Sequence, residues 1–107
     1  MGIYKSVTIL ALSESEQKEY LLEMEVYPST DELALEFSDS FKAYLGHCAE
    51  HPNSYNPDLL NRLQQIEDLL DEMSDLNSSI WDVSSLNNIY WNEIRFLANS
   101  ILIDGFR

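Results

Sequence analysis

The fold is decided by residues 57–76, which read PDLLNRLQQIEDLLDEMSDL and carry the strongest pattern in the chain. Their apolar residues recur in steps of three and four, the spacing that lines side chains along one face of an α-helix. Asn56 is a good N-cap residue, and Pro57 suits the first helical position. We therefore predict a helix over 57–76 whose narrow apolar seam packs against other helices. The seam consists of Leu59, Leu63, Ile66, Leu70, Met73 and Leu76.

A second helix is expected before this one, over about 30–48. Residues 29–32 read STDE, which fits a capping box after Pro28, and the early acidic residues suit the helix dipole. Apolar residues then recur at helical spacing. They are Leu33, Phe37, Phe41, Tyr44, Leu45 and Cys48.

A third helix is expected after the helix over 57–76, over about 88–104. Apolar residues surround much of this stretch, so we expect the helix to be central. Gly105 suits the C′ position that ends such a helix. The main stripe consists of Tyr90, Ile94, Leu97 and Ile101, joined by Trp91, Ala98 and Leu102. The expected fold is mainly α, a bundle of these three main helices in a single domain over residues 1–107, because the chain has no linker or repeat.

Residues 5–27 leave two structures open. Residues 6–12 are β-branched and apolar, and residues 18–27 alternate between apolar and polar side chains, which favours strands. We expect a β-hairpin over about 5–27 that packs on the helices, since a lone hairpin is only marginally stable. The alternative is a further helix that begins at Ser13, with Glu16 completing a capping box.

The charge of the chain restricts its partners. Its 19 acidic and 6 basic side chains give a formal net charge of −13, which argues against direct binding to nucleic acid or to an anionic membrane. A basic protein partner, met at an electrostatically steered rate, is favoured instead. The single cysteine, Cys48, cannot form an internal disulfide, and no apolar run approaches the ~20 residues of a membrane span. We therefore expect a cytoplasmic protein that does not bind membranes.

Acidic residues gather on the faces opposite the apolar stripes. On the helix over 57–76 they stand four residues apart and Arg62 is the only base, an imbalance that costs the isolated helix stability and favours a surface selected for binding. Tyr55 lies in a polar loop and is a possible aromatic anchor for a partner. The predicted partner-binding residues are Glu67, Asp68, Asp71, Glu72, Asp75, Asp31, Glu32, Glu36, Asp39 and Tyr55.

Metal binding and catalysis are not favoured. His47 and His51 stand four residues apart with Cys48 between them, but a structural zinc site needs four ligands and no second ligand pair is present. The sequence has no nucleophile elbow, phosphate-binding glycine loop, zinc-protease motif or calcium-binding loop. We expect no cofactor, no metal and no enzymatic activity. The aromatic residues Trp81, Tyr90, Trp91 and Phe96 are expected in the core.

One family resemblance covers about half of the chain. It rests on the acidic Leu-rich stretch over 59–76, on SIWDV at 79–83 and on NIYWNEIRFLA at 88–98. In acidity, size and helix order these stretches resemble the small immunity proteins of bacterial toxin systems, the contact-dependent growth inhibition type in particular. The resemblance implies a cytoplasmic, non-enzymatic protein that binds the C-terminal domain of a cognate toxin, often a nuclease.

Two functions are therefore predicted. The first is an immunity or inhibitor protein, monomeric, that neutralises a basic toxin domain through its acidic surface. The alternative is a helical adaptor or regulatory subunit, in which the apolar seam over 59–73 would stay exposed for a partner helix.

Overall fold

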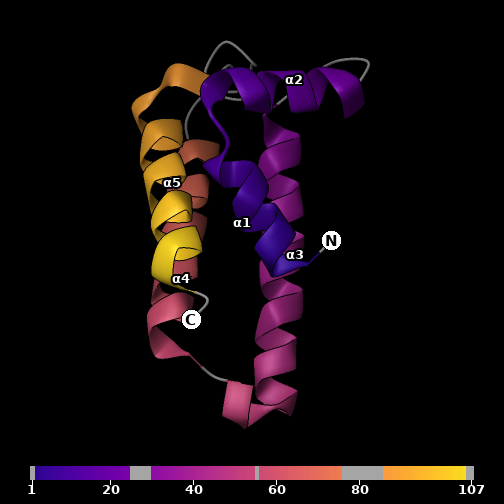
Figure 1. Cartoon of the computed structure of the whole chain (residues 1–107), viewed down its shortest axis with the longest axis vertical. Coiled ribbons are helices and arrows are strands. Elements are labelled where there is room, and N and C mark those ends of the chain that lie inside the picture. Colours follow the sequence, from indigo (N-terminus) through magenta and orange to yellow (C-terminus); the bar gives the residue numbers. More distant parts are fainter. Residues whose placement is uncertain (1, 25–29, 55, 76–85, 106–107) are drawn as a thin grey trace.

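The computed structural model describes residues 2–24, 30–54, 56–75 and 86–105. These residues form five α-helices and two short helical turns, and none of them is in a β-strand. The long helix α3 forms one side of the molecule, and α4 and α5 run together along the other (Figure 1). Helix α1 packs against both α3 and α5, and α2 crosses one end. The elements are α1 (Ile3–Ala11), α2 (Glu14–Met24), α3 (Asp31–Glu50), η1 (Pro52–Ser54), α4 (Pro57–Ser74), α5 (Ile89–Ser100) and η4 (Ile101–Gly105).

The β-hairpin expected over about 5–27 is wrong, because its described residues form α1 and α2. In α1, Val7 and Leu10 are buried three residues apart, a helical spacing, where the helix packs against α3 and α5. This packing overrides the strand preference of β-branched residues. In α2 the alternation has no structural role, since Leu21 is buried and the adjacent Leu22 is 53% exposed. Residues 25–27 lie outside the described residues.

The helix start at Ser13, the alternative to the hairpin, is present. The Ser13 hydroxyl oxygen accepts a hydrogen bond from the backbone N–H of Glu16 at 3.2 Å. In return, a carboxylate oxygen of Glu16 accepts from the Ser13 hydroxyl at 2.9 Å and from the Ser13 backbone N–H at 3.3 Å. This reciprocal pair is a capping box at the start of α2, and only two residues separate α1 from α2.

The prediction of a mainly helical protein is confirmed, but the count of three main helices is wrong because α1 and α2 add two more. The predicted N-cap at Asn56 is confirmed, and α5 begins close to the predicted residue 88, with Asn88 as its N-cap. The Asn56 side chain accepts from the backbone N–H of Leu59 at 3.1 Å, and that of Asn88 accepts from Trp91 at 2.8 Å. Thr30 precedes α3 without a side-chain capping bond, and Ser29, the first residue of the predicted capping box, lies outside the described residues.

Gly105 has a different role from the one predicted. No described glycine has a positive φ, so Gly105 does not end the helix in the left-handed conformation of a C′ residue. It closes the single π-helical turn η4 and is buried. A Cβ atom at this position would lie 3.0 Å from Cγ2 of Ile101. Close packing of the last turn, and not backbone freedom, therefore favours glycine here.

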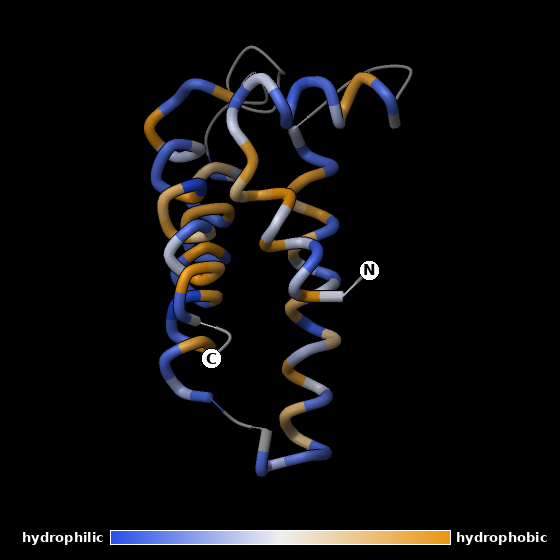
Figure 2. Tube along the Cα trace, viewed as in Figure 1, coloured by the Kyte–Doolittle hydropathy of each residue, from blue (hydrophilic) through white to orange (hydrophobic). Residues whose placement is uncertain are grey.

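The core lies where α1, α3, α4 and α5 meet and consists of their buried apolar residues. Apolar positions are orange along the trace in Figure 2. All five residues of the predicted seam that the structure describes are buried in the core. They are Leu59, Leu63, Ile66, Leu70 and Met73. The buried stripe of α5 is formed by Trp91, Ile94 and Ala98, which turns the helix slightly from the predicted orientation and leaves Tyr90 and Leu97 half-buried.

Candidate functional site

The acidic face predicted on α4 is present, with one exception. Asp68, Asp71, Glu72 and Asp75 are exposed, whereas Glu67 is half-buried. Successive helical residues are turned by about 100°, so the four exposed residues fall on the side of α4 away from the buried seam. We call these four residues the outer acidic face.

Glu67 has a structural role. The hydroxyl of Ser38 on α3 donates to both carboxylate oxygens of Glu67, at 3.0 Å each. Burial raises the pKa of the Glu67 carboxyl, and the nearby charge of Asp71 adds to this, although the hydrogen bond from Ser38 acts in the opposite direction. Because this carboxylate joins α3 to α4, we remove Glu67 from the predicted binding surface.

The predicted acidic residues of α3 are divided in the same way. Asp31 and Asp39 are exposed, and Glu32 and Glu36 are half-buried. The hydroxyl of Tyr20 donates to the two carboxylate oxygens of Glu36 at 3.2 and 3.0 Å. Burial, together with this carboxylate, raises the pKa of Tyr20 to about 12. Glu36 therefore links α3 to α2, and this part of the predicted surface is smaller than expected.

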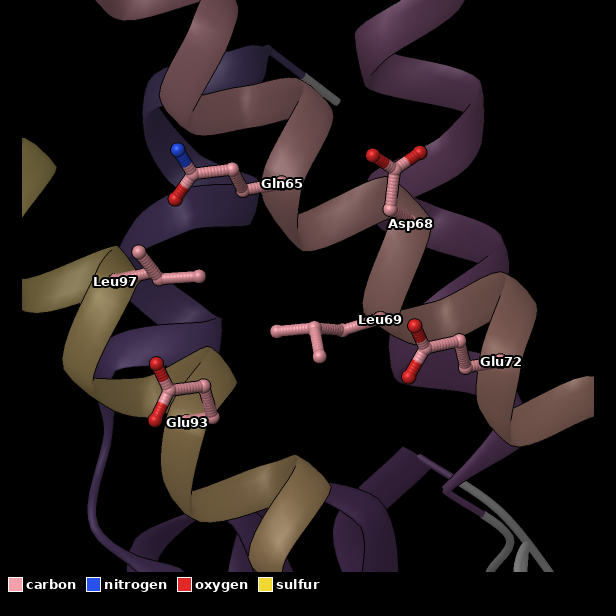
Figure 3. Close-up of a pocket in the computed structure, with 6 residues that line it drawn as sticks. All are labelled: Gln65, Asp68, Leu69, Glu72, Glu93 and Leu97. Carbon is pink, nitrogen blue, oxygen red and sulfur yellow. The ribbon is translucent and has the colours of Figure 1, made fainter.

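An open groove runs between α4 and α5, and sequence reasoning did not predict it. It comprises two adjoining hollows of about 300 and 250 Å³ that share Leu69 and Glu93. Leu69 and Leu97 point toward one another across it (Figure 3). The residues that line this α4/α5 groove are Gln65, Asp68, Leu69 and Glu72 from α4, and Ile89, Tyr90, Glu93 and Leu97 from α5.

The rim of the α4/α5 groove is acidic. Asp68 and Glu72 stand on its α4 side and Glu93 on its α5 side, and all three are exposed. Asp68 accepts a hydrogen bond from the side chain of Gln64 at 3.0 Å, which orients its carboxylate. Among the described residues no lysine or arginine forms an ion pair with any of the three. The groove thus joins apolar side chains to uncompensated negative charge.

A line of exposed apolar side chains continues this surface along α5 and into η4. Ile89 is 76% exposed, and Phe96 and Ile103 are each 68% exposed. Ile89 and Phe96 stand seven residues apart, close to two turns of α5, which places them on one face, and Ile103 follows in the π-helical turn η4. We call these three residues the α5 ridge. The helix over 88–104 is therefore central on only one side, and the prediction that Phe96 belongs to the core is wrong, whereas Trp91 is fully buried.

The α5 ridge had a signal in the sequence. Ile89, Phe96 and Ile103 form a seven-residue repeat that is visible without a structure. The repeat does not identify an exposed face by itself. Apolar residues surround this helix, and the sequence pattern alone does not show which of its apolar stripes is buried.

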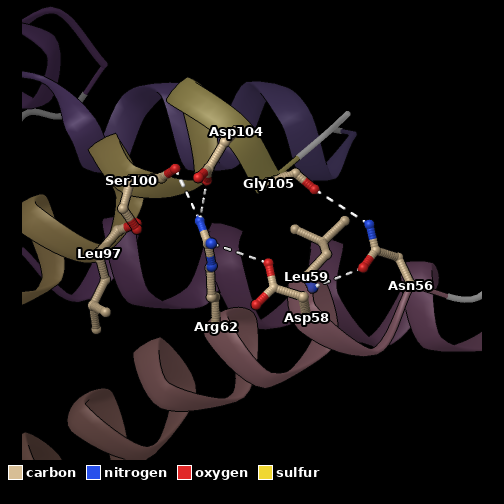
Figure 4. A network of polar contacts seen from close by, with 8 residues as sticks. All are labelled: Asn56, Asp58, Leu59, Arg62, Leu97, Ser100, Asp104 and Gly105. Atoms are coloured by element: carbon tan, nitrogen blue, oxygen red, sulfur yellow. Dashed lines mark hydrogen bonds and ion pairs between the residues drawn. The ribbon is translucent and has the colours of Figure 1, made fainter.

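Arg62, the single base of α4, is bonded to partners on α4, α5 and η4. Arg62 forms ion pairs with Asp58, at 3.0 Å, and with Asp104, and it donates to the backbone oxygen of Ser100 at 3.0 Å (Figure 4). The hydrogen bond to Asp104 raises the pKa of Arg62. The cation therefore fastens η4 to α4 and does not neutralise the outer acidic face farther along the helix.

Cys48, His47 and His51, which were considered as metal ligands from the sequence, are not gathered into a metal site. Cys48 is buried, while His47 and His51 are exposed, with ring centroids 4.7 Å apart. Within the described part of the chain, no three His, Cys, Asp or Glu residues are grouped so that they could hold a metal ion. No helix in that part is both long and apolar enough to cross a membrane. The predicted anchor Tyr55 and the aromatic Trp81 lie outside the described residues.

Comparisons of the chain with protein-family models, with curated proteins and with solved structures find no match. The features of the described surface that bear on function are the outer acidic face, the α4/α5 groove and the α5 ridge.

Proposed function

We propose that this protein is a non-enzymatic inhibitor, of the immunity-protein kind, that binds and neutralises a basic toxin domain such as a nuclease. The observation that carries the proposal is the outer acidic face of α4, where exposed carboxylates follow one another while Arg62 is occupied by Asp58 and Asp104. Carboxylates without interspersed bases repel one another, so they cost the isolated protein stability and become favourable when a cationic surface covers them.

A toxin that acts on nucleic acid fits this surface. Nucleic-acid-binding domains carry Lys and Arg that neutralise phosphates, and the release of counterions rewards this contact. A row of carboxylates can replace those phosphates and thereby cover the substrate face of the toxin. The inhibitor would act as a monomer in the cytoplasm, where the lone thiol of Cys48 stays reduced.

The burial of the apolar seam argues against the alternative function, a helical adaptor or regulatory subunit. It requires the residues over 59–73 to be exposed to a partner helix, but all five are buried in the core of the isolated chain. Opening the core to offer them would expose apolar surface that folding has buried, at a cost of about 1.5–3 kcal/mol for each large side chain. We do not propose this function.

The test begins with a search for a neighbouring reading frame that encodes a large secreted protein, and it uses the C-terminal domain of that protein if the domain is basic. We expect co-expression with this inhibitor to restore growth to cells that make the toxin domain, and the two purified proteins to associate more slowly as salt concentration rises. A toxin domain that neither binds nor is neutralised would contradict the proposal. Association that salt leaves unchanged would contradict its electrostatic basis.

A matched pair of variants locates the binding surface. Replacing Asp71 and Asp75 with lysine should slow association by about tenfold at low salt, because electrostatic steering depends on these charges. The control replaces Glu19 and Glu23 of α2, also exposed, with lysine and changes the net charge equally. Equal slowing by both pairs would show that only the total charge matters and not the outer acidic face.

A further inference from the structure

The α4/α5 groove and the α5 ridge form one continuous surface, since Ile89 belongs to both. From Ile89 to the end of α5 at Ser100 the helix is about 16 Å long at 1.5 Å per residue, and η4 extends the ridge to Ile103, so at least three turns of a second helix can lie beside it. The groove offers that helix half-buried apolar side chains at its base, Leu69, Tyr90 and Leu97. Shape and spacing therefore fit a helix that presents one apolar stripe.

The acidic rim of the groove favours a helix whose side chains carry positive charge. Asp68 and Glu72 flank the groove on one side and Glu93 on the other, so cationic side chains beside an apolar stripe would meet carboxylates on both sides. Lysine and arginine also have long apolar stems that can cover the edges of the groove while their charges reach the rim. An acidic or neutral helix would leave these carboxylates without compensation as water is displaced.

A second copy of this chain is a poor occupant of the same surface. Each copy has a formal net charge of −13, and a symmetric pair would bring acidic rims together. Charge complementarity therefore favours a partner of opposite sign.

We propose that the α4/α5 groove, with the α5 ridge, binds a basic amphipathic helix of the partner protein. This helix inserts apolar residues between Leu69 and Leu97, and its Lys and Arg side chains pair with Asp68, Glu72 and Glu93. That the helix belongs to a toxin domain rests on the proposed function, whereas the recognition chemistry depends only on the surface.

The probe is a fluorescein-labelled peptide of about 20 residues, because shorter helices are marginal in water. Leucines stand at i, i+3, i+4 and i+7 along it, and lysines flank them. One control peptide has the same composition in shuffled order, and a second has glutamate in place of lysine. We expect fluorescence anisotropy to show binding of the first peptide that weakens with salt, and about tenfold or weaker binding of both controls.

Two groups of protein variants test the placement. Ile89→Ser with Phe96→Ser, and separately Glu72→Lys with Glu93→Lys, should each weaken peptide binding by about tenfold or more. The matched apolar control is Leu22→Ser, and the matched charge control is Glu19→Lys with Glu23→Lys. These positions are exposed, so thermal unfolding should stay close to that of the original protein.

Three results would overturn the proposal. The shuffled peptide could bind as tightly as the amphipathic one, the groove variants could bind no worse than their controls, or the free protein could sediment as a dimer that Phe96→Ser dissociates. The two proposals fail separately. A toxin domain still neutralised by the groove variants refutes only the groove, and peptide binding without any toxin binding refutes only the inhibitor function.

Discussion

The guanidinium of Arg95, on α5, donates a hydrogen bond of 2.7 Å to the side-chain oxygen of Gln17, which lies on α2 and is completely buried. The amide nitrogen of Gln17 in turn donates to the backbone oxygens of Ile9 and Leu10 at 3.2 and 3.0 Å. Burial lowers the pKa of Arg95. These hydrogen bonds join the end of α1, the start of α2 and the middle of α5. No pattern in the sequence predicted them.

The first prediction concerns this pair. Gln17→Ala and Arg95→Ala should each lower the free energy of unfolding by about 1–3 kcal/mol, because each leaves polar groups of its partners without a bond. The double variant should lose less than the sum of the two, by about 0.5 kcal/mol or more. Urea unfolding of the four proteins measures this, and strictly additive losses would show that the bond contributes no coupling.

A second prediction tests the buried seam. Leu63→Ala should cost about 2–5 kcal/mol in the free energy of unfolding, since it leaves a cavity at a fully buried position on α4. The same change at the exposed Leu22 should stay within about 0.5 kcal/mol. If the two changes cost the same, the seam would be available to a partner and the adaptor function would regain support.

The third prediction follows from the raised pKa of Glu67. The folded protein holds the proton more tightly than the unfolded chain, so this site favours folding at low pH and loses that contribution as pH rises through its folded pKa. Glu67→Gln removes the charge and keeps an acceptor for Ser38. We expect the variant to be more stable at pH 7, by less than about 1 kcal/mol because the group is partly screened by solvent.

The advantage of Glu67→Gln should shrink as pH falls toward the ordinary glutamate value of 4.5. Urea unfolding at a series of pH values measures the trend. Glu23→Gln, the same change at an exposed position on α2, serves as the control. A stability difference that grows on acidification would mean that the charged form is favoured in the folded protein, contrary to our expectation.

The fourth prediction concerns the attachment of η4. Arg62→Gln removes the ion pairs to Asp58 and Asp104, so backbone amides of residues 101–105 should exchange with deuterium faster, while the middle of α5 keeps its protection. Mass spectrometry of peptic fragments resolves the two regions. Lys42→Gln removes an exposed positive charge from α3 and should leave the exchange of η4 as it was. Unchanged exchange in Arg62→Gln would assign the attachment to apolar packing alone.

The N-terminal helices show where local pattern was not sufficient. The stretch around Val7 reads as a strand because β-branched residues prefer extended backbone, and only contact with α3 and α5 makes the helix better. The capping box of Ser13 and Glu16 pointed the other way and was correct. A local hydrogen-bonding pattern between residues three apart can be recognised in sequence, whereas the benefit of burial depends on a partner surface.

In the candidate site, too, local features could be predicted from the sequence, whereas contacts between distant residues could not. The sequence placed Asp68, Asp71, Glu72 and Asp75 on one outer face, because helical spacing fixes directions around α4. It could not show that Glu67 is bonded to Ser38, since these residues are 29 positions apart. Nor could it show that Leu69 and Leu97 face each other across a groove, because that depends on how two helices lie together.

By itself the sequence determined the helical character of α3, α4 and α5, the capping start at Asn56, and the acidity of the surface. These features follow from side-chain period, capping chemistry and charge, which act within a few residues. Only the tertiary structure decided that α1 and α2 are helices, that Glu67 and Glu36 join helices, and that Ile89, Phe96 and Ile103 stay exposed beside an acidic groove. Those outcomes depend on which surfaces become buried against one another, and that is a property of the assembled fold.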